Sequence, residues 1–171
     1  MSQQFILETS RLLLRPFAAE DASSLYLLNS DPLVLQYTGD VPFKDVNEAA
    51  EFILQYNHYM QYGYGRWAVL DRESSAFLGW CGLKYSPEKK ESDIGFRLHR
   101  EYWGRGFATE AAKVCIDYGF ADLGISRIVG RAQAGNISSH KVLEKIGMTQ
   151  IGILRDGSEH WMLFEKLPPG K

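Results

Sequence analysis

Asp93-Ile-Gly-Phe-Arg-Leu-His-Arg-Glu-Tyr-Trp-Gly-Arg-Gly-Phe-Ala-Thr-Glu-Ala111 is the stretch of this chain that decides the fold we expect. It passes from a strand-like run, through a turn rich in glycine, directly into a run typical of a helix. Glycines let the backbone N–H groups of a turn converge, and the helix N-terminus adds partial positive charge. The turn from Trp103 to Ala108 is therefore suited to hold the oxygens of a phosphate group.

Two common phosphate-binding motifs can be tested against the spacing of this turn. A P-loop has a lysine directly after its second glycine, but Phe107 follows Gly106. A Rossmann fingerprint needs a third glycine and an early strand–helix–strand unit, whereas this turn lies late in the chain. The spacing therefore excludes both motifs. The Gly-x-Ser-x-Gly elbow of a serine hydrolase does not occur in the chain either.

The patterns on either side of this stretch predict a mixed α/β sheet in a single domain that spans residues 1–171. Polar turns separate three central strand-like runs, which indicates an antiparallel meander. Asp31-Pro32 is expected to close an early helix, and a long helix begins at Asp45 and ends at Tyr62-Gly-Tyr-Gly65. We expect strands at 11–16, 66–70, 77–85, 93–98, 127–132, 150–154 and 160–164, and further helices at 21–29, 108–121 and 138–146.

The composition is that of an ordinary globular protein. Hydrophobic residues make up 45% of the 171 residues, charged residues 23%, and the formal net charge is −2. These values exclude a disordered or fibrous chain and give no general attraction to nucleic acid or an anionic membrane. The N-terminus lacks the features of a signal peptide, and no stretch approaches the roughly 20 apolar residues of a membrane span. We therefore expect a cytoplasmic protein in which Cys81 and Cys115 are buried thiols.

Several segments at ordered spacing make the chain resemble the GNAT superfamily of N-acetyltransferases, in particular the branch that acetylates the N-termini of ribosomal proteins. The segments are Thr9-Ser-Arg-Leu-Leu-Leu-Arg-Pro16, Ile94-Gly-Phe96, Tyr102-Trp-Gly-Arg-Gly-Phe-Ala-Thr-Glu-Ala111, Asn136-Ile-Ser-Ser139 and Val142-Leu-Glu-Lys-Ile-Gly-Met148. Together they cover almost the whole chain. The resemblance implies a twisted, mostly antiparallel sheet that splays open at its central strands and is flanked by helices.

The resemblance also implies acetyl-coenzyme A as the acetyl donor and direct attack by an amine. The pyrophosphate would lie on the backbone amides of Gly104 to Thr109, and the pantetheine arm would run beside Phe96 to Leu98. A backbone amide there would polarise the thioester carbonyl, because a fixed donor stabilises charge that develops on the oxygen. The residues expected to bind the coenzyme are Phe96, Arg97, Leu98, Trp103, Gly104, Arg105, Gly106, Phe107, Ala108, Thr109, Asn136 and Ser139.

Proton transfer in such a reaction needs an acid and a base. Many members of the family have a tyrosine seven residues beyond the motif asparagine, which protonates the leaving thiolate, but here that position is Leu143. We expect Ser139, one helical turn earlier, either to replace the tyrosine or only to bind the coenzyme. The amine must lose a proton, and Asp93 is the expected base with Glu91 in reserve. Glu110 is expected to interact with the helix dipole instead.

The acceptor is the least determined part of the function. A protein N-terminal α-amine is expected first; a small amine such as a polyamine or aminoglycoside is the alternative. A non-catalytic coenzyme A-binding module and a nucleotide-binding protein are the rival classes. Candidates for the acceptor pocket are Tyr37-Thr-Gly-Asp40, Trp67 and the tyrosines of segment 59–64. The histidines are scattered along the chain, so we expect no metal site, and a monomer or homodimer is expected.

Overall fold

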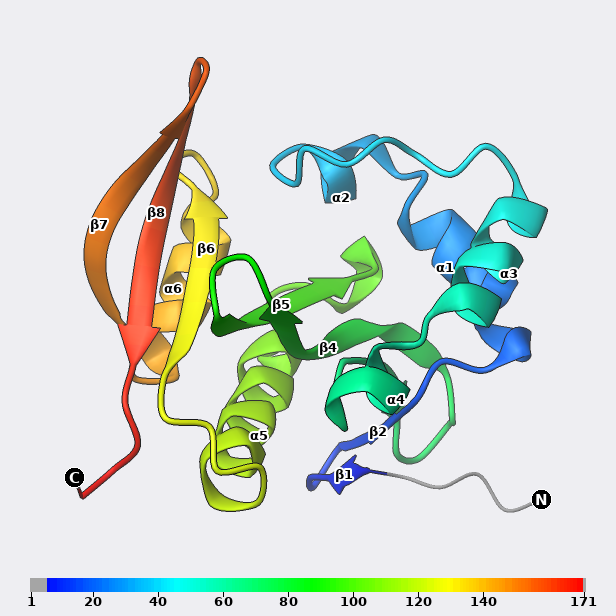
Figure 1. The fold of residues 1–171 in the computed structure, drawn as a ribbon. Helices are drawn as coiled ribbons and strands as arrows, with labels where there is room; N and C mark the ends of the chain where they lie inside the picture. The colour runs from blue at the N-terminus through cyan, green and yellow to red at the C-terminus, as the bar shows by residue number, and fades with distance from the viewer. Residues whose placement is uncertain (1–5, 171) are drawn as a thin grey trace.

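A mixed sheet of eight strands, in the order β1-β2-β3-β4-β5-β6-β8-β7, runs through the computed structural model, which describes residues 6–170 (Figure 1). Neighbouring strands are antiparallel except β5 and β6, which are parallel. The strands are β1 Leu7–Glu8, β2 Leu12–Arg15, β3 Arg66–Asp71, β4 Phe77–Ser86, β5 Glu91–Leu98, β6 Ile128–Gln133, β7 Thr149–Asp156 and β8 Glu159–Lys166. The expected mixed sheet and its antiparallel meander are confirmed.

The junction between β5 and β6 is short. Only Ser92, Asp93 and Ile94 of β5 pair with β6, opposite residues 128–130. Beyond Ile94, β5 continues to Leu98 while paired with β4 alone. The sheet therefore opens at this point into two arms, β1 to β5 and β6 to β8, and the expected splay is confirmed (Figure 1).

Helices cover both faces of the sheet. The α-helices are α1 Ala22–Leu28, α2 Pro32–Leu35, α3 Val46–Gln55, α4 His58–Tyr62, α5 Phe107–Ala121 and α6 Ile137–Lys145, with short 3₁₀ helices at Ala19–Asp21 and Arg100–Tyr102. The helix α5 buries Ala111 and Cys115 in the larger core, against strands of both arms. On the opposite face, α1 packs Leu25 and Leu28 toward Trp80 of β4 in a smaller core. No helix within residues 6–170 is long and apolar enough to cross a membrane.

Two local predictions were wrong, and both concern the first third of the chain. The predicted long helix is interrupted: α3 ends at Gln55, Tyr56 is extended, and α4 begins at His58. The hydroxyl of Tyr56 accepts a hydrogen bond from the backbone N–H of Arg66. This contact with β3 accompanies the extended backbone at Tyr56, where the helix ends. Asp31-Pro32 begins α2 rather than ending α1, because the Asp31 carboxylate caps the N–H of Leu33.

Candidate functional site

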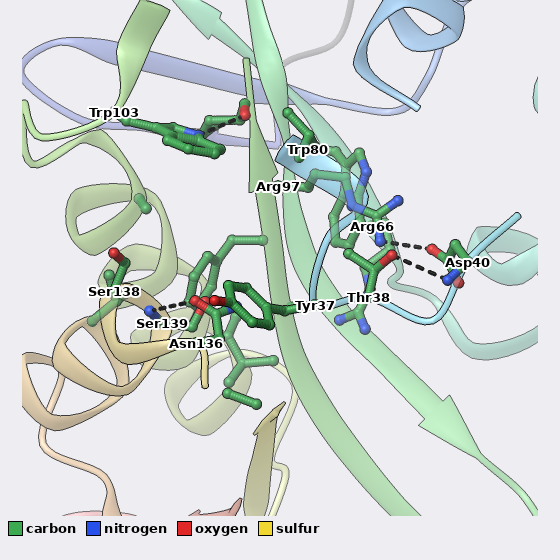
Figure 2. Close-up of a pocket in the computed structure, with 18 of the residues that line it drawn as sticks. Tyr37, Thr38, Asp40, Arg66, Trp80, Arg97, Trp103, Asn136, Ser138 and Ser139 are labelled. Carbon is green, nitrogen blue, oxygen red and sulfur yellow. Dashed lines mark hydrogen bonds and ion pairs between the residues drawn. The ribbon is translucent and has the colours of Figure 1, made fainter. Parts of the chain in front are cut away.

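A cavity of about 1040 Å³ lies where the sheet opens, and it has two walls. One wall comes from the end of β5, the glycine-rich turn and the first turns of α5 and α6, and the other from α1, α2, α3 and the segments that follow them (Figure 2). The predicted site residues that line it are Asp93, Phe96, Arg97, Leu98, Trp103, Gly104, Gly106, Phe107, Ala108, Thr109, Asn136 and Ser139. Arg105 is exposed and lies outside the lining, with its guanidinium over the Phe107 ring.

The glycine-rich turn presents free backbone donors to this cavity. Gly104 and Gly106 have φ values of 71° and 80°, a left-handed backbone that favours glycine. Gly106 is the N-cap of α5, and no side chain caps this helix end. The first N–H groups of α5 therefore have no partner within the helix, and the helix dipole adds positive charge at the same place. This turn fits a pyrophosphate group.

Arg11 of the N-terminal segment holds the turn in place. Its Nη1 donates to the carbonyl oxygen of Arg105 at 2.9 Å, and its Nη2 pairs with the Glu110 carboxylate at 2.7 Å. The Thr9 hydroxyl donates to the same carboxylate at 2.6 Å. Burial alone would raise the pKa of Glu110, but the hydrogen bonds from Thr9 and Arg11 outweigh it and leave the pKa below its ordinary value. Sequence reasoning missed Arg11, although it lies in the first segment of the family resemblance.

The end of β5 forms the floor between the two walls. Phe96 packs toward the α5 core, whereas the side chain of Arg97 lies on the opposite face of the sheet. The indole Nε1 of Trp103 donates to the carbonyl oxygen of Leu98 at 2.8 Å and so fixes the turn against the strand (Figure 2). Arg97 can therefore meet a coenzyme only through its backbone, because its guanidinium is engaged on the other side.

The first turn of α6 completes the wall that the end of β5, the glycine-rich turn and α5 form. The Asn136 Oδ1 caps the helix by accepting a hydrogen bond from the Ser139 N–H at 3.2 Å (Figure 2). Among the described residues, neither the Asn136 amide nitrogen nor the Ser139 hydroxyl has a partner, so both remain available to a ligand. Leu143 is 1% exposed and belongs to the core, which agrees with its inability to donate a proton.

Asp93 lies on the same face of β5 as Arg97, between two other arginines. Arg66 Nη2 donates to its Oδ1 at 2.6 Å, and Arg131 Nη1 lies 3.7 Å from its Oδ2. Arg66 also donates to the backbone carbonyl of the same residue at 3.0 Å. These contacts orient the carboxylate at the edge of the cavity. Neither arginine was singled out from the sequence, because the two come from β3 and β6, far apart along the chain.

Three other groups considered for chemistry lie outside the cavity. Glu91, the reserve base, pairs with Arg127 and Arg131 and has no place in the lining. Cys81 and Cys115 are free, fully buried thiols with their sulfurs 3.9 Å apart, as the sequence predicted. Burial raises the pKa of Cys115 well above its ordinary value, and the neighbouring thiol adds to this effect, so neither cysteine is placed to act as a nucleophile.

The residues expected to form the acceptor pocket lie in two different places. Tyr37, Thr38 and Asp40 line the cavity, and Asp40 Oδ2 accepts a hydrogen bond from Arg97 Nη2 at 2.6 Å (Figure 2). Trp67, however, is 1% exposed and packs against Tyr118 in the core. The tyrosines at 59, 62 and 64 also lie outside the lining, because their rings pack around β3 and β4. Within residues 6–170, no group of three or more His, Cys, Asp or Glu side chains is arranged to hold a metal ion.

The sheet opens beside an uncapped helix N-terminus, and beyond Ile94 the strand β5 is paired with β4 alone, an arrangement that fits a long ligand bearing a pyrophosphate. Residues 11–149 match the acetyltransferase (GNAT) domain family. The chain is 37% identical over 152 residues to the uncharacterized N-acetyltransferase p20 of Bacillus licheniformis, covering 88% of this chain and 85% of that protein. It belongs to the GNAT family and is an acetyl-coenzyme A-dependent N-acetyltransferase.

Solved structures share this fold at lower sequence identity. A ribosomal-protein-S5-alanine acetyltransferase from Vibrio fischeri matches with a TM-score of 0.80 at 20% identity, over 95% of this chain and 96% of that one. A spermidine N-acetyltransferase from Vibrio cholerae, in complex with CoA and spermine, matches with a TM-score of 0.78 at 20% identity, over 93% and 96% of the two chains. At this identity the matches establish the fold and leave the acceptor open.

Proposed function

We propose that this acetyltransferase acts on an amine that carries a single positive charge, and that a protein N-terminal α-amine is its acceptor. The observation that carries the proposal is the charge of the cavity. Within the described residues its acidic side chains are Asp40 and Asp93, whereas Arg66, Lys84, Arg97, Arg131, Lys141 and Lys145 are basic. A polyamine or aminoglycoside carries several ammonium groups, and this excess of positive charge would repel them.

The two acidic groups are already engaged, which strengthens the argument. Asp40 pairs with Arg97, and Asp93 pairs with Arg66. A second ammonium group would have to compete with a guanidinium for either carboxylate. A peptide N-terminus brings one ammonium together with backbone carbonyl oxygens that can accept hydrogen bonds from arginine. Aromatic rings on the same wall, such as Phe52 and Trp80, offer an apolar surface to the first side chain of the peptide.

The coenzyme would be held by the wall built from the end of β5, the turn and α6. The amides at the start of α5 would bind the pyrophosphate, and Asn136 and Ser139 would contact the pantetheine arm near its sulfur. When bound, acetyl-coenzyme A supplies an activated acetyl group. Asp93 would accept the proton of the attacking ammonium, directly or through water, because an ammonium has no lone pair with which to attack. Since Arg66 and Arg131 fix the carboxylate, its position is set before the acceptor arrives.

The acceptor is tested by mass spectrometry of a panel incubated with the protein and acetyl-coenzyme A. The panel contains peptides with free N-termini, the same peptides with blocked N-termini and one internal lysine, spermidine, and an aminoglycoside. We expect a gain of one acetyl group on the free N-termini and none on the blocked peptides. The free peptides should start with small residues in one half of the set and with acidic residues in the other.

Two other results would overturn the proposal. Acetylation of spermidine or of the aminoglycoside in preference to the peptides would assign the enzyme to small polyamines and contradict the charge argument. Tight binding of coenzyme A without transfer to any member of the panel would favour a coenzyme-binding module. Isothermal titration with coenzyme A, run on the same preparation, separates this second result from a protein that has simply lost its fold.

A further inference from the structure

Tyr37 lines the cavity and lies where its two walls come into contact. It follows α2 on the acceptor side, yet its ring reaches across the open sheet toward the first turn of α6, where Asn136 and Ser139 lie (Figure 2). The ring rests on Gly135: a β-carbon added at that glycine would lie 3.0 Å from Tyr37 Cε1. A side chain from the acceptor wall therefore contacts the coenzyme wall directly, and the absence of a side chain at position 135 makes room for it.

The loop that carries Tyr37 is fixed at its other end. The Thr38 hydroxyl donates to the Leu35 carbonyl oxygen at 3.0 Å, and the Asp40 N–H donates to the Thr38 oxygen at 3.1 Å. Asp40 then pairs with Arg97 of β5, which also donates to Asn29 Oδ1 at 2.9 Å. The loop is thus attached to β5 through Asp40, and the Tyr37 ring lies against Gly135. The Tyr37 hydroxyl has no hydrogen-bond partner among the described residues.

The other hydroxyl groups of the cavity are less well placed for a reaction at the open end of β5. The Thr38 hydroxyl already donates a hydrogen bond to the Leu35 carbonyl oxygen within its own loop. The Tyr56 hydroxyl accepts from the Arg66 N–H beside β3, and Tyr102 packs against Phe107 next to the phosphate turn. Burial raises the pKa of both of these tyrosines, which makes them weaker acids. Ser139 remains as a competitor together with Ser138 and Thr109, and all three are on the wall that Tyr37 reaches.

Acid strength separates a phenol from an alcohol as a proton donor to a thiolate. An ordinary thiol has a pKa of about 8.5 and an ordinary phenol about 10, so the proton moves uphill by roughly 1.5 units. An aliphatic alcohol is a far weaker acid, with a pKa close to that of water, so the same transfer is much further uphill. A phenol can therefore protonate a leaving thiolate, whereas a serine hydroxyl is poorly matched to that task.

We propose that Tyr37 is the general acid of this enzyme, taking the place of the tyrosine whose usual position holds Leu143. The inference rests on the acetyl transfer proposed above. As the amine nitrogen forms its bond to the acetyl carbon, the carbon–sulfur bond breaks and its electron pair moves to sulfur. Tyr37 gives its hydroxyl proton to that sulfur and regains one from solvent, while the proton lost by the amine leaves through Asp93 or water. Ser139 then binds the coenzyme without supplying the proton.

The test compares Tyr37→Phe with Ser139→Ala and a matched control, using release of coenzyme A with the best acceptor of the panel. We expect Tyr37→Phe to lower kcat by about 10²-fold, the lower end for a general acid, because a thiolate leaves fairly readily without help. Its KM for acetyl-coenzyme A should stay unchanged, because the ring still fills its place on Gly135. Ser139→Ala should instead raise that KM. Tyr26→Phe, which removes an unpaired hydroxyl outside the cavity on α1, should change neither.

A second comparison uses the glycine that supports the ring. Gly135 has no left-handed backbone, so Gly135→Ala can fold, but its methyl group must push the Tyr37 ring aside. We expect this change to lower kcat in the parent enzyme and to have little further effect on kcat in the Tyr37→Phe variant, because the displaced hydroxyl is already gone. Equal losses in both backgrounds would contradict a role for the hydroxyl and indicate that position 135 acts by itself.

The outcomes separate the two proposals. An active parent whose Tyr37→Phe variant keeps its kcat overturns the role of Tyr37 alone; a concurrent loss of kcat in Ser139→Ala would then assign the proton to the serine. A parent that binds coenzyme A but acetylates no acceptor overturns the proposed acceptor and the role of Tyr37 with it.

Discussion

Asp93 is the residue on which the proposed proton removal depends. Replacing it with asparagine keeps the shape of the side chain and removes its charge. We expect Asp93→Asn to lower kcat by about 10²–10⁴-fold at neutral pH, as loss of a positioned base does. The loss should shrink as pH rises, because more of the amine is then deprotonated without help. Steady-state kinetics from pH 6.5 to 9.5 measure both effects.

Glu91→Gln is the matched control for this experiment. Glu91 shares Arg131 with Asp93, but it lies outside the cavity, so its loss perturbs the same arginine without removing the base. The control should keep most of the activity of the parent at every pH. If Asp93→Asn has the same kcat as the Glu91→Gln control at every pH, Asp93 is a structural residue and its assignment as the base is contradicted.

The sequence predicted the coenzyme wall better than the acceptor wall. The residues from Phe96 to Thr109 are contiguous, so one motif places most of them at the cavity. Arg66 and Arg131, which orient Asp93, come from separate strands, and only the register of the sheet brings them together. Trp67 illustrates the opposite error: an aromatic residue on a predicted strand can face either side, and here it faces the core.

The N-terminus of α5 is the proposed binding site of the coenzyme pyrophosphate. Gly106 has a φ of 80°, a conformation that costs other residues about 1–2 kcal/mol. We expect Gly106→Ala to destabilise the protein by about this amount and also to weaken binding of coenzyme A, because a methyl group at the N-cap disturbs the donors of the turn. Urea denaturation and isothermal titration measure the two effects separately.

Gly124→Ala provides the comparison. Gly124 has a φ of 65° and lies beyond the other end of α5, where an added β-carbon meets nothing within 4 Å. The strain should therefore lower the free energy of unfolding to a similar extent and leave coenzyme affinity intact. If both variants bind coenzyme A as the parent does, the pyrophosphate lies elsewhere.

The contact of α5 with the N-terminal segment predicts a pH dependence. Glu110 accepts hydrogen bonds from Thr9 and Arg11 that hold its pKa below the ordinary 4.5. A lowered pKa in the folded state means that the contribution to stability is complete above 4.5 and is lost as pH falls through the lower folded value. We expect Glu110→Gln to reduce the free energy of unfolding by about 1–2 kcal/mol at pH 7, with the difference from the parent closing at acid pH.

Asp117→Asn tests whether this effect belongs to the partly buried contact with the N-terminal segment or to charge on the helix. Asp117 is on the same helix and pairs with Lys113 at the surface. Exposed pairs of this kind contribute about 0.3–0.5 kcal/mol, so the variant should lose little stability at any pH. A loss at Glu110 no larger than that at Asp117 would contradict the role of Glu110 as the tie between the N-terminal segment and α5.

The molecule as a whole should respond to its coenzyme by becoming more stable. A ligand that binds only the folded protein at about 100 times its Kd adds roughly 2.7 kcal/mol, which corresponds to a rise in Tm of about 5–10 °C for a chain of this size. Acetyl-coenzyme A and coenzyme A should both produce this rise. Pantetheine, which lacks the pyrophosphate, should produce a much smaller one. Absence of any shift with coenzyme A at millimolar concentration would contradict binding in the open sheet.

The architecture was predicted largely from order along the chain, and its errors have physical causes. The meander and the alternation that follows it gave the strands of both arms except β1, and the splay at the central strands came from the family resemblance. The break at Tyr56 could not be read locally, because it depends on a hydrogen bond to Arg66 of a later strand. The helical pattern through this segment was right on either side of the break, where no such contact competes.

The two walls of the cavity are also two portions of the polypeptide. Most of the acceptor wall comes from residues 17–66, and most of the coenzyme wall comes from residues 93–145. Donor and acceptor recognition can thus diverge separately in a lineage, provided that an insertion or exchange in the first portion keeps its contacts with the second, such as that of Arg66 with Asp93. Tyr37 belongs to the first portion. A lineage that acquires a new acceptor by exchanging this portion would have to retain Tyr37 or supply another general acid.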